Sequence, residues 1–328
     1  MTTLYVDRRD ASLSLQAETL VIRAGEERAR MPLSRITRLI VRAPAQLDAS
    51  LLAKLWSQGS GLLILSGRRN EATARMAGRP NLDIERRRRQ VRVQDDAEAL
   101  LGLAQPIVHS KIIAQGRTLE KLAEMRASAR PAILRANRQL EAAARASAFA
   151  TTLDQLRGYE GAAASAYWLA YASAFAPSLM MTGRNRRPPR DPVNVGLSLS
   201  YTLAHFEAAR QAEIIGLDPM LGALHAPARG RDSLASDLIE PLRPRIDLWV
   251  WRLFAERVLR VEHFSHDADG RCLMGKAGRG AFYSAWEEAS PPWNRWLRLA
   301  ARSWARRVAP DLLPVGLETA RFEAMSVD

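Results

Sequence analysis

Three side chains in the second half of the sequence are of types that bind divalent cations. His225 lies in a loop rich in proline, glycine and arginine, and Asp237 and Glu240 follow within sixteen residues. The two acids are three positions apart, so both point to one side of a helix that Asp232 or Ser233 can cap. Carboxylate and imidazole groups are suitable ligands for Mg²⁺ or Mn²⁺. The alternative is a structural histidine, the commoner role of a lone histidine in a loop.

A helical segment upstream of these residues carries a further carboxylate on an apolar face. Glu160 shares this face with Ala163 and Tyr167, at steps of three and four. A carboxylate turned inward is costly unless it is paired or bound to a cation. Gly158 and Gly161 flank it, although each weakens a helix by about 1 kcal/mol relative to alanine, which indicates the close approach of another backbone or a ligand. The alternative is that Glu160 pairs with an arginine.

An arginine-rich loop lies between these two segments. Prolines stiffen the loop, and four arginines lie within seven residues: Arg184, Arg186, Arg187 and Arg190. Phosphates would neutralise charges held this close together, and guanidinium groups suit phosphate oxygens. Arg229 and Arg231, close to His225, are further candidates for contacts with a nucleic-acid backbone. The alternative is a solvated surface loop.

The first eighty residues contain the elements of a small β domain. Short apolar runs between turn-forming residues predict strands near 4–6, 13–15, 19–22, 36–41 and 62–65. One helix interrupts them from Asp48, a suitable N-cap, to about Gln58. We expect a β-sandwich-like domain over residues 1–80 that takes part in dimerisation. A basic linker over residues 81–96 follows.

From residue 97 to 328 the pattern is helical and rich in alanine, leucine and arginine. Apolar residues recur at three- and four-residue spacing near 97–126, 130–148, 152–174, 195–214, 245–260 and 293–308. Asp191 or Asn194 can cap the fourth of these helices, and a polar hairpin is expected around 266–270. The tryptophans of the C-terminal helices have a spacing that suits packing in the core. The predicted fold class is α+β, with a small N-terminal β-sandwich-like domain followed by a larger all-α catalytic domain.

Composition limits the classes to which the chain can belong. Its 328 residues include 48 Lys and Arg against 35 Asp and Glu, and the net charge of +13 favours a polyanion such as DNA. An arginine-rich proteome would give the same surplus. No apolar run reaches the roughly 18 residues of a membrane span. The N-terminus lacks the features of a signal peptide, and the single cysteine, Cys272, excludes an intrachain disulfide, so we expect a cytoplasmic protein.

Four segments occur in a distinctive order. They are Gly-Tyr-Glu-Gly at 158–161, Arg-Asp-Pro-Val-Asn at 190–194, Gly-Leu-Asp-Pro at 216–219 and Gly-Arg-Asp-Ser-Leu-Ala-Ser-Asp-Leu-Ile-Glu-Pro-Leu-Arg-Pro at 230–244. With the histidine between the last two, they resemble the CRISPR-associated spacer-acquisition integrase family. The resemblance covers roughly residues 150–285, and its last segment is too long for a chance match.

This resemblance implies a metal-dependent endonuclease and integrase. It implies that Mg²⁺ or Mn²⁺ is bound by Glu160, His225 and Glu240, with Asp237 as a further acid at the site. Three more positions match polar or basic residues beside the site of the family: Asn194, Tyr201 and Arg243. The resemblance also implies a homodimer, and the assembly of two dimers around a small partner protein.

The expected reaction is a transesterification that inserts short DNA fragments, or spacers, into a CRISPR array. The attacking group is the 3′-hydroxyl of an incoming DNA end in integration and water in hydrolysis, with a divalent ion that polarises the scissile phosphate. His225 binds a metal only when neutral, so activity is expected to fall at acid pH. Two alternatives are a non-catalytic DNA-binding scaffold, in which these acids form structural ion pairs, and a stand-alone, structure-selective nuclease of the same fold.

Overall fold

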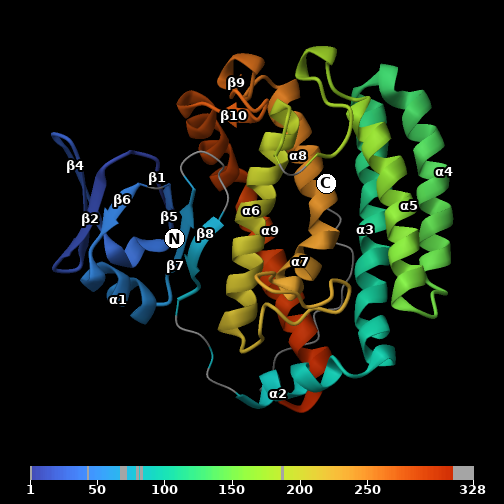
Figure 1. The fold of residues 1–328 in the computed structure, drawn as a ribbon, viewed down its shortest axis with the longest axis horizontal. Helices are drawn as coiled ribbons and strands as arrows, with labels where there is room; N and C mark the ends of the chain where they lie inside the picture. The colour runs from blue at the N-terminus through green and yellow to red at the C-terminus, as the bar shows by residue number, and fades with distance from the viewer. Residues whose placement is uncertain are drawn as a thin grey trace.

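The computed structural model describes residues 2–42, 44–66, 72–78, 81, 84–185 and 188–312. A β domain at the N-terminal end lies beside a larger, mostly helical domain (Figure 1). This arrangement confirms the predicted α+β fold class. A two-stranded hairpin interrupts the helical part, where the polar segment around 266–270 predicted it.

Two four-stranded sheets form most of the β domain. The first has the strand order β1-β5-β7-β8, with bounds β1 (Thr2–Val6), β5 (Ile36–Arg42), β7 (Gly61–Leu65) and β8 (Ala72–Met76). The second has the order β4-β3-β2-β6, with bounds β4 (Glu27–Pro32), β3 (Thr19–Ala24), β2 (Ala11–Gln16) and β6 (Ala45–Leu47). In the first sheet β1, β5 and β7 run parallel, and β8 is antiparallel to β7. The sandwich therefore contains crossover connections as well as hairpins.

Helix α1 (Ala49–Ser57) begins where the sequence predicted. The Asp48 carboxylate accepts a hydrogen bond from the backbone N–H of Ser50 (2.9 Å), which caps the helix. Leu51 and Leu55 are fully buried in a core to which strands of both sheets contribute. The sequence did not predict β4, β6 and β8. All three end a sheet, and β4 and β8 expose most of their side chains, so they lack the apolar alternation of a strand with one buried face.

The basic segment between the domains contains helix α2 (Ile84–Val93). Arg86 is buried, and its guanidinium donates hydrogen bonds to backbone carbonyl oxygens that include that of Leu312. Arg89 forms an ion pair with Asp311. These two arginines therefore tie α2 to the C-terminal end of the helical domain.

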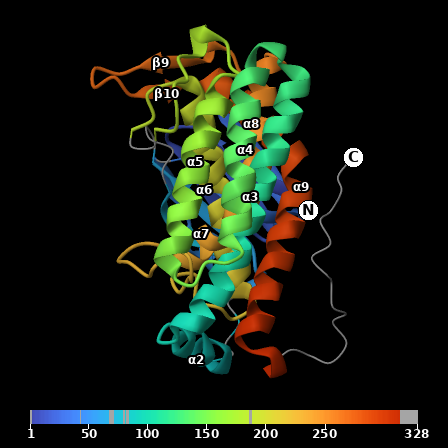
Figure 2. The same ribbon diagram turned by 90° about the vertical axis from the view of Figure 1, so that its right-hand side faces the viewer.

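The helical domain has an outer layer and a central group of helices. The outer layer lies farthest from the β domain (Figures 1 and 2) and contains α3 (Ala97–Met125), α4 (Arg130–Ser147) and α5 (Leu153–Ala172). The central group contains α6 (Pro192–Ile214), α7 (Ser233–Ile239), α8 (Arg243–Ala255) and α9 (Lys276–Val308). The hairpin pairs β9 (Phe264–His266) with β10 (Cys272–Met274). Short 3-10 helices connect these elements: η1 (Leu33–Arg35), η2 (Ala127–Ala129), η3 (Pro177–Leu179), η4 (Glu240–Leu242), η5 (Val261–His263) and η6 (Pro310–Leu312).

Helix α6 runs through the core of the helical domain. Most of its residues from Val193 to Ala212 are buried, because α7, α8 and α9 pack around it. Trp249, Trp286 and Trp293 pack edge to face, with ring centroids 5.2 to 5.5 Å apart. These contacts confirm the prediction that the C-terminal tryptophans serve packing. Among the described helices, none combines the length and apolar character needed to cross a membrane.

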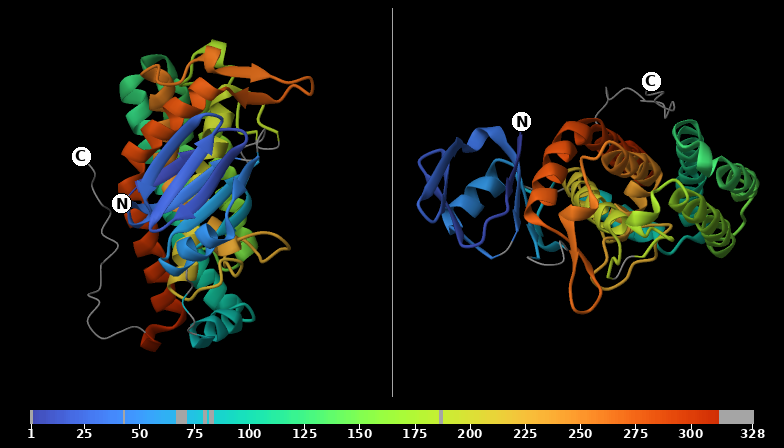
Figure 3. Two further views of the ribbon diagram at one scale, coloured as in Figure 1. Left: turned by 90° about the vertical axis from the view of Figure 1, so that its left-hand side faces the viewer. Right: turned by 90° about the horizontal axis from the view of Figure 1, so that it is seen from above.

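Polar contacts join the β domain to the helical domain. Arg38 of β5 forms an ion pair with Glu207 of α6, with 2.6 Å between Nε and Oε2. The Tyr5 hydroxyl donates to Glu287 of α9 (2.7 Å). Arg75 of β8 pairs with a residue at the start of α7. Figure 3 shows the β domain against the side of the helical domain that α6 and α9 form, so β8 is attached next to the loop that carries the predicted site.

Candidate functional site

Glu160, Lys111 and Glu240 come from three separate elements and meet at one point. Glu160 lies on α5, Lys111 on α3, and Glu240 at the start of η4. The Lys111 Nζ lies 2.6 Å from Glu160 Oε1 and 2.6 Å from Glu240 Oε2. The side chains of Glu160 and Lys111 are 18% and 12% exposed, and that of Glu240 is 5% exposed, so the cluster borders solvent on one side. The ion-pair partner of Glu160 is thus a lysine, and the alternative of an arginine partner is wrong.

The His225 side chain is held by the buried carboxylate of Asp237. His225 Nδ1 lies 2.6 Å from Asp237 Oδ1, and the backbone N–H groups of 223–225 donate to the same carboxylate at 2.6 to 3.1 Å. An ionised carboxylate only accepts, so Nδ1 carries the hydrogen of this bond, and it is Nε2 that has the lone pair in the neutral imidazole. Nε2 faces Glu240, 3.9 Å from Oε1. Asp237 and Glu240 therefore flank one imidazole, as their spacing predicted.

The close approach of these amides to Asp237 depends on a glycine. A β-carbon at Gly222 would lie 2.7 Å from Asp237 Oδ2 and 2.8 Å from the carbonyl carbon of Ser233, which is closer than van der Waals contact. Asp232 occupies the N-cap position of α7, as predicted, but its side chain makes no capping hydrogen bond. The Ser233 hydroxyl instead donates to the carbonyl oxygen of Ala226 (3.0 Å).

Arg243 adds a second positive charge beside Glu240. Its Nε donates to Glu240 Oε1 at 2.8 Å. Burial opposes ionisation of Glu240, but Arg243 and Lys111 outweigh burial and hold the pKa of its carboxyl well below its usual range. Glu240 is therefore ionised at neutral pH, as a metal ligand must be.

The donor set fits a divalent cation once Lys111 is taken into account. Within the described part of the chain, no three Asp, Glu, His or Cys side chains are close enough together to hold one ion. The Lys111 ammonium lies between the two carboxylates, which hold a cation there already. Two carboxylates and an imidazole nitrogen are suitable ligands for Mg²⁺ or Mn²⁺. The chemistry of Glu160, Glu240 and His225 therefore suits such an ion, although in this structure the Lys111 ammonium lies between the two carboxylates.

A further buried acid, Asp247 of α8, lies close to this centre. Its carboxylate accepts hydrogen bonds from the hydroxyls of Tyr167 (2.8 Å) and Tyr201. The Arg243 guanidinium lies over the Tyr201 ring, 4.3 Å from the centroid. Asp247 could not be found from the sequence, because a single acid in a helical segment gives no signal of its role.

Asn194 and Tyr201, both predicted beside the site, are interior residues. Asn194 is fully buried, and its side-chain amide donates to the carbonyl oxygen of Gly183 (2.8 Å) and to Asp191 Oδ2 (2.7 Å). Asp191 accepts a hydrogen bond from the Asn194 backbone N–H (2.8 Å) and caps α6, as predicted. Tyr201 is 7% exposed and faces Asp247. Both residues therefore support the centre from the interior of the domain and do not form part of its surface.

The predicted DNA-binding arginines divide into exposed and engaged residues. Arg190, Arg229 and Arg231 are exposed. Arg184 turns inward and donates to Asn194 Oδ1 (2.6 Å), and Arg243 is engaged with Glu240 as described above. Two further candidates lie outside the described residues: Arg186 and Arg187.

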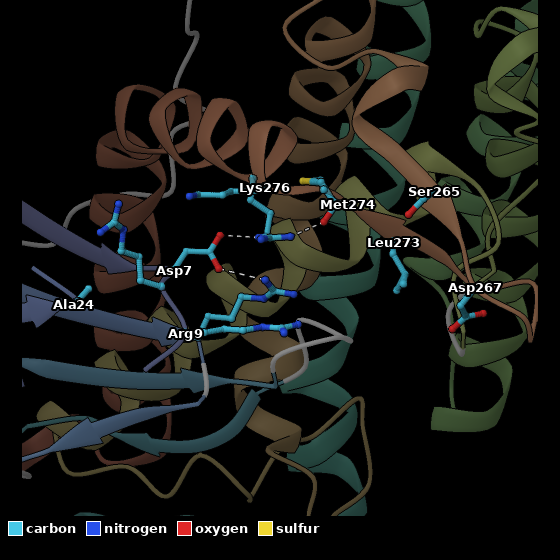
Figure 4. A pocket seen from close by; sticks show the side chains of 13 residues that line it. Asp7, Arg9, Ala24, Ser265, Asp267, Leu273, Met274 and Lys276 are labelled. Carbon is cyan, nitrogen blue, oxygen red and sulfur yellow. Dashed lines mark hydrogen bonds and ion pairs between the residues drawn. The ribbon is translucent and has the colours of Figure 1, made fainter. Parts of the chain in front are cut away.

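A cationic pocket lies between the β domain and the β9–β10 hairpin (Figure 4). It encloses about 790 Å³, and its charged lining residues are Arg8, Arg9, Arg42, Lys276, Arg279, Asp7 and Asp267. Asp7 pairs with both Arg42 (3.1 Å) and Arg279 (2.6 Å). The lining keeps a net positive charge and suits an anion. The pocket could not be found from the sequence, because the fold brings its residues together from distant segments.

An acidic centre with a histidine, set beside exposed arginines, suits an enzyme that acts on phosphodiesters. Comparison with known proteins identifies the family. Residues 4–288 match the family model described as CRISPR associated protein Cas1. The chain therefore belongs to the Cas1 family of CRISPR-associated endonucleases and integrases, which confirms the resemblance found in the sequence.

Similar proteins cover nearly the whole chain. A CRISPR-associated endonuclease Cas1 from Thermodesulfovibrio yellowstonii is 32% identical over 321 residues, which cover 95% of this chain and 98% of that protein. A casposase bound to integration product has a TM-score of 0.82 at 20% identity and covers 94% of this chain and 90% of that one. A chain of a Cas6-RT-Cas1–Cas2 complex has a TM-score of 0.79 at 18% identity, covering 94% of this chain and 35% of that one. The last two likenesses concern the fold alone.

Proposed function

We propose that this protein is a divalent-metal-dependent DNA endonuclease and integrase that inserts spacers into a CRISPR array by transesterification. One observation carries the proposal. Glu160 and Glu240, 80 residues apart in the sequence, are held together by the Lys111 ammonium, and His225 Nε2 lies 3.9 Å from the other oxygen of Glu240. Asp237 holds the imidazole so that its free nitrogen faces Glu240.

Glu160, Glu240 and His225 would hold Mg²⁺ or Mn²⁺. When bound, the ion would polarise the scissile phosphate and stabilise charge on the leaving oxygen. Asp237 keeps His225 in the tautomer that has Nε2 available, and Arg243 fixes Glu240 at one oxygen.

The surface beside this centre suits a DNA backbone. Arg229 and Arg231, on the loop that follows His225, are exposed and would bind phosphates with little sequence preference, and Arg190 is exposed next to the β9–β10 hairpin. Gly158 and Gly161 are exposed beside Glu160, and a β-carbon at either would have no atom within 4 Å. The glycines thus leave open surface, and the close approach of another backbone or a ligand stays a prediction.

We further propose a homodimer through the β domain (1–80) and assembly with a small partner protein. In this proposal residues 97–328 form the catalytic domain. The likeness in fold to a chain of a Cas6-RT-Cas1–Cas2 complex is consistent with such an assembly, and the likeness to a casposase bound to integration product is consistent with strand joining.

A strand-transfer assay tests the proposal. The purified protein is mixed with short DNA duplexes and a supercoiled plasmid, in Mn²⁺ or in EDTA, for wild type and His225→Ala. Joining that requires the metal and disappears in the variant is the expected result.

Other results would favour the two alternatives. Cutting without joining, also after addition of the partner protein, would favour a stand-alone nuclease. DNA binding with neither activity in either metal would favour a non-catalytic scaffold.

A further inference from the structure

Lys111 occupies the position between the two carboxylates of the proposed metal centre. Its Nζ is 2.6 Å from an oxygen of each, and neither distance leaves room for a second cation between the same two oxygens. A divalent ion of this kind binds carboxylate oxygens at about 2.0 to 2.2 Å. The ammonium and the ion therefore compete for one place.

Packing of α3 fixes Lys111 there. Val108 and Ile112, on either side of it in the helix, are buried in the core. Two turns further along α3, the Thr118 hydroxyl donates to the carbonyl oxygen of Pro244 (2.9 Å), four residues after Glu240. The helix that carries the ammonium is thus attached to the segment that carries the acid.

The residue type is also informative. The chain contains four lysines and 44 arginines, yet the cation at this point is a lysine. A guanidinium binds a carboxylate with two fixed, parallel hydrogen bonds, whereas an ammonium is a compact charge on a flexible stem. An ammonium can leave two carboxylates without disturbing the backbone, and the partly exposed side chain of Lys111 leads toward solvent.

We propose that Lys111 is a positioning residue that holds Glu160 and Glu240 together in the metal-free protein and is displaced when the divalent ion binds. This inference rests on the proposed function of the same site. Lys111 keeps the carboxylates at a spacing that suits an ion, and it lowers the affinity for the ion because it must first be removed.

Binding of Mn²⁺ to the full-length protein without DNA tests this inference. Free Mn²⁺ is followed by electron paramagnetic resonance for wild type, Lys111→Met and Lys111→Arg, with Lys121→Met as the matched control. Lys121 lies on the same helix and is exposed. Lys111→Met removes the charge at similar volume and is expected to bind Mn²⁺ at least about tenfold more tightly, because a repelling charge beside the ion is lost. Lys111→Arg is expected to bind it more weakly than wild type, and Lys121→Met to match wild type.

A purely structural role for Lys111 would weaken metal binding in both variants. Mn²⁺ binding by Lys111→Met that is equal to or weaker than that of wild type would overturn the inference. This holds provided that the single variant Glu240→Gln no longer binds Mn²⁺. If Glu240→Gln and Glu160→Gln leave Mn²⁺ binding unchanged, the proposed metal centre itself fails, and the inference fails with it.

Melting temperatures, measured with and without Mn²⁺, keep the test decisive if Lys111→Met folds poorly. Loss of the ammonium removes a cation shared by both carboxylates and leaves Glu240 with Arg243 alone, which destabilises the metal-free variant. Its melting temperature is therefore expected to rise more with Mn²⁺ than that of wild type. If Lys111→Met is unfolded at every Mn²⁺ concentration, Lys111→Arg decides, and wild-type Mn²⁺ affinity in that variant would contradict displacement.

Discussion

Glu240 and Asp247 are two buried acids, seven residues apart, with opposite acid–base properties. Burial by itself raises the pKa of both carboxyls. For Glu240, Arg243 and Lys111 outweigh burial and lower the pKa well below its usual range. For Asp247, burial outweighs the hydrogen bonds from two tyrosine hydroxyls and raises the pKa to about 6.

The opposite pKa shifts reflect two kinds of partner: the Lys111 ammonium beside Glu240, which we propose is exchangeable, and the tyrosine hydroxyls around Asp247, which are fixed. The Lys111 ammonium is a separate charge at the edge of solvent, and in our proposal a metal ion takes its place beside Glu240. The tyrosine hydroxyls around Asp247 belong to rings that are buried in the core. Arg243 links the two regions, since it donates to Glu240 and lies over the ring of Tyr201. Burial of an acid is thus no sign of catalysis unless its partner can be exchanged.

The largest effect is expected from removal of the proposed ligands. Glu160→Gln, His225→Ala and Glu240→Gln should each lower strand cutting and joining by about 10³-fold or more, because a metal ion contributes several kcal/mol of charge stabilisation in the transition state. Asp247→Asn should retain most of the activity. Initial rates of strand transfer in excess Mn²⁺ measure both.

DNA affinity is the control for these variants. Mobility shifts should change by no more than about threefold, because exposed arginines and not the ligands bind the backbone. Equal losses of activity in Asp247→Asn and Glu240→Gln would contradict the conclusion that only Glu240 takes part in catalysis.

The next effect concerns the pH dependence of stability. The pKa of Asp247 is about 6 in the folded protein against a usual value near 3.8. Between these values the folded state holds a proton that the unfolded state has lost, so the contribution of Asp247 to stability falls as pH rises through 6. The fall is on the order of 3 kcal/mol. Glu240 has the opposite sign, since its contribution is present above its unfolded pKa and is lost as pH falls.

Asp247→Asn isolates this contribution. The difference in unfolding free energy between wild type and Asp247→Asn, measured with urea at pH 4, 5, 6 and 7, should shift in favour of the variant as pH rises. The other groups cancel in this difference. A difference that stays constant from pH 4 to 7 would mean that the pKa of Asp247 is not raised.

The sequence predicted the fold class and the proposed ligands for separate reasons. Helices and buried strands follow from apolar periodicity, and Asp48 and Asp191 were identified as N-caps because capping is local. Glu160, His225 and Glu240 were found through the motif around each one. Edge strands such as β4 were missed, because their exposed side chains carry no such pattern.

What the sequence could not supply is contact between distant segments. Lys111 lies 49 residues before Glu160 with no motif around it, so only the packing of α3 on α5 reveals its role. The same reason explains Asn194 and Tyr201, which were matched to positions beside the site but turned out to be buried supports. In the basic run at 86–89, charge suggested a linker, whereas the buried Arg86 belongs to a helix.

Asp237 is a third buried acid, and its role lies between those of Glu240 and Asp247. Burial raises its pKa, and the hydrogen bonds from His225 and the backbone amides oppose this rise. It lacks a cation to exchange but positions a proposed ligand. Asp237→Asn should lower Mn²⁺ affinity by about 10- to 100-fold, because an amide cannot accept all the hydrogen bonds that orient His225. Calorimetric titration of Mn²⁺ measures the change, and wild-type affinity would show that the imidazole needs no support.

The smallest effect is expected from Tyr201→Phe, which removes one hydroxyl from Asp247 and leaves the ring under Arg243. The lost hydrogen bond should cost about 1 to 2 kcal/mol of unfolding free energy in urea. Strand transfer should change by less than about threefold, because Arg243 keeps its hydrogen bond to Glu240. If activity fell 100-fold at unchanged stability, Tyr201 would act in the reaction. Glu240 and Asp247 would then both contribute to the reaction, in spite of their opposite pKa shifts.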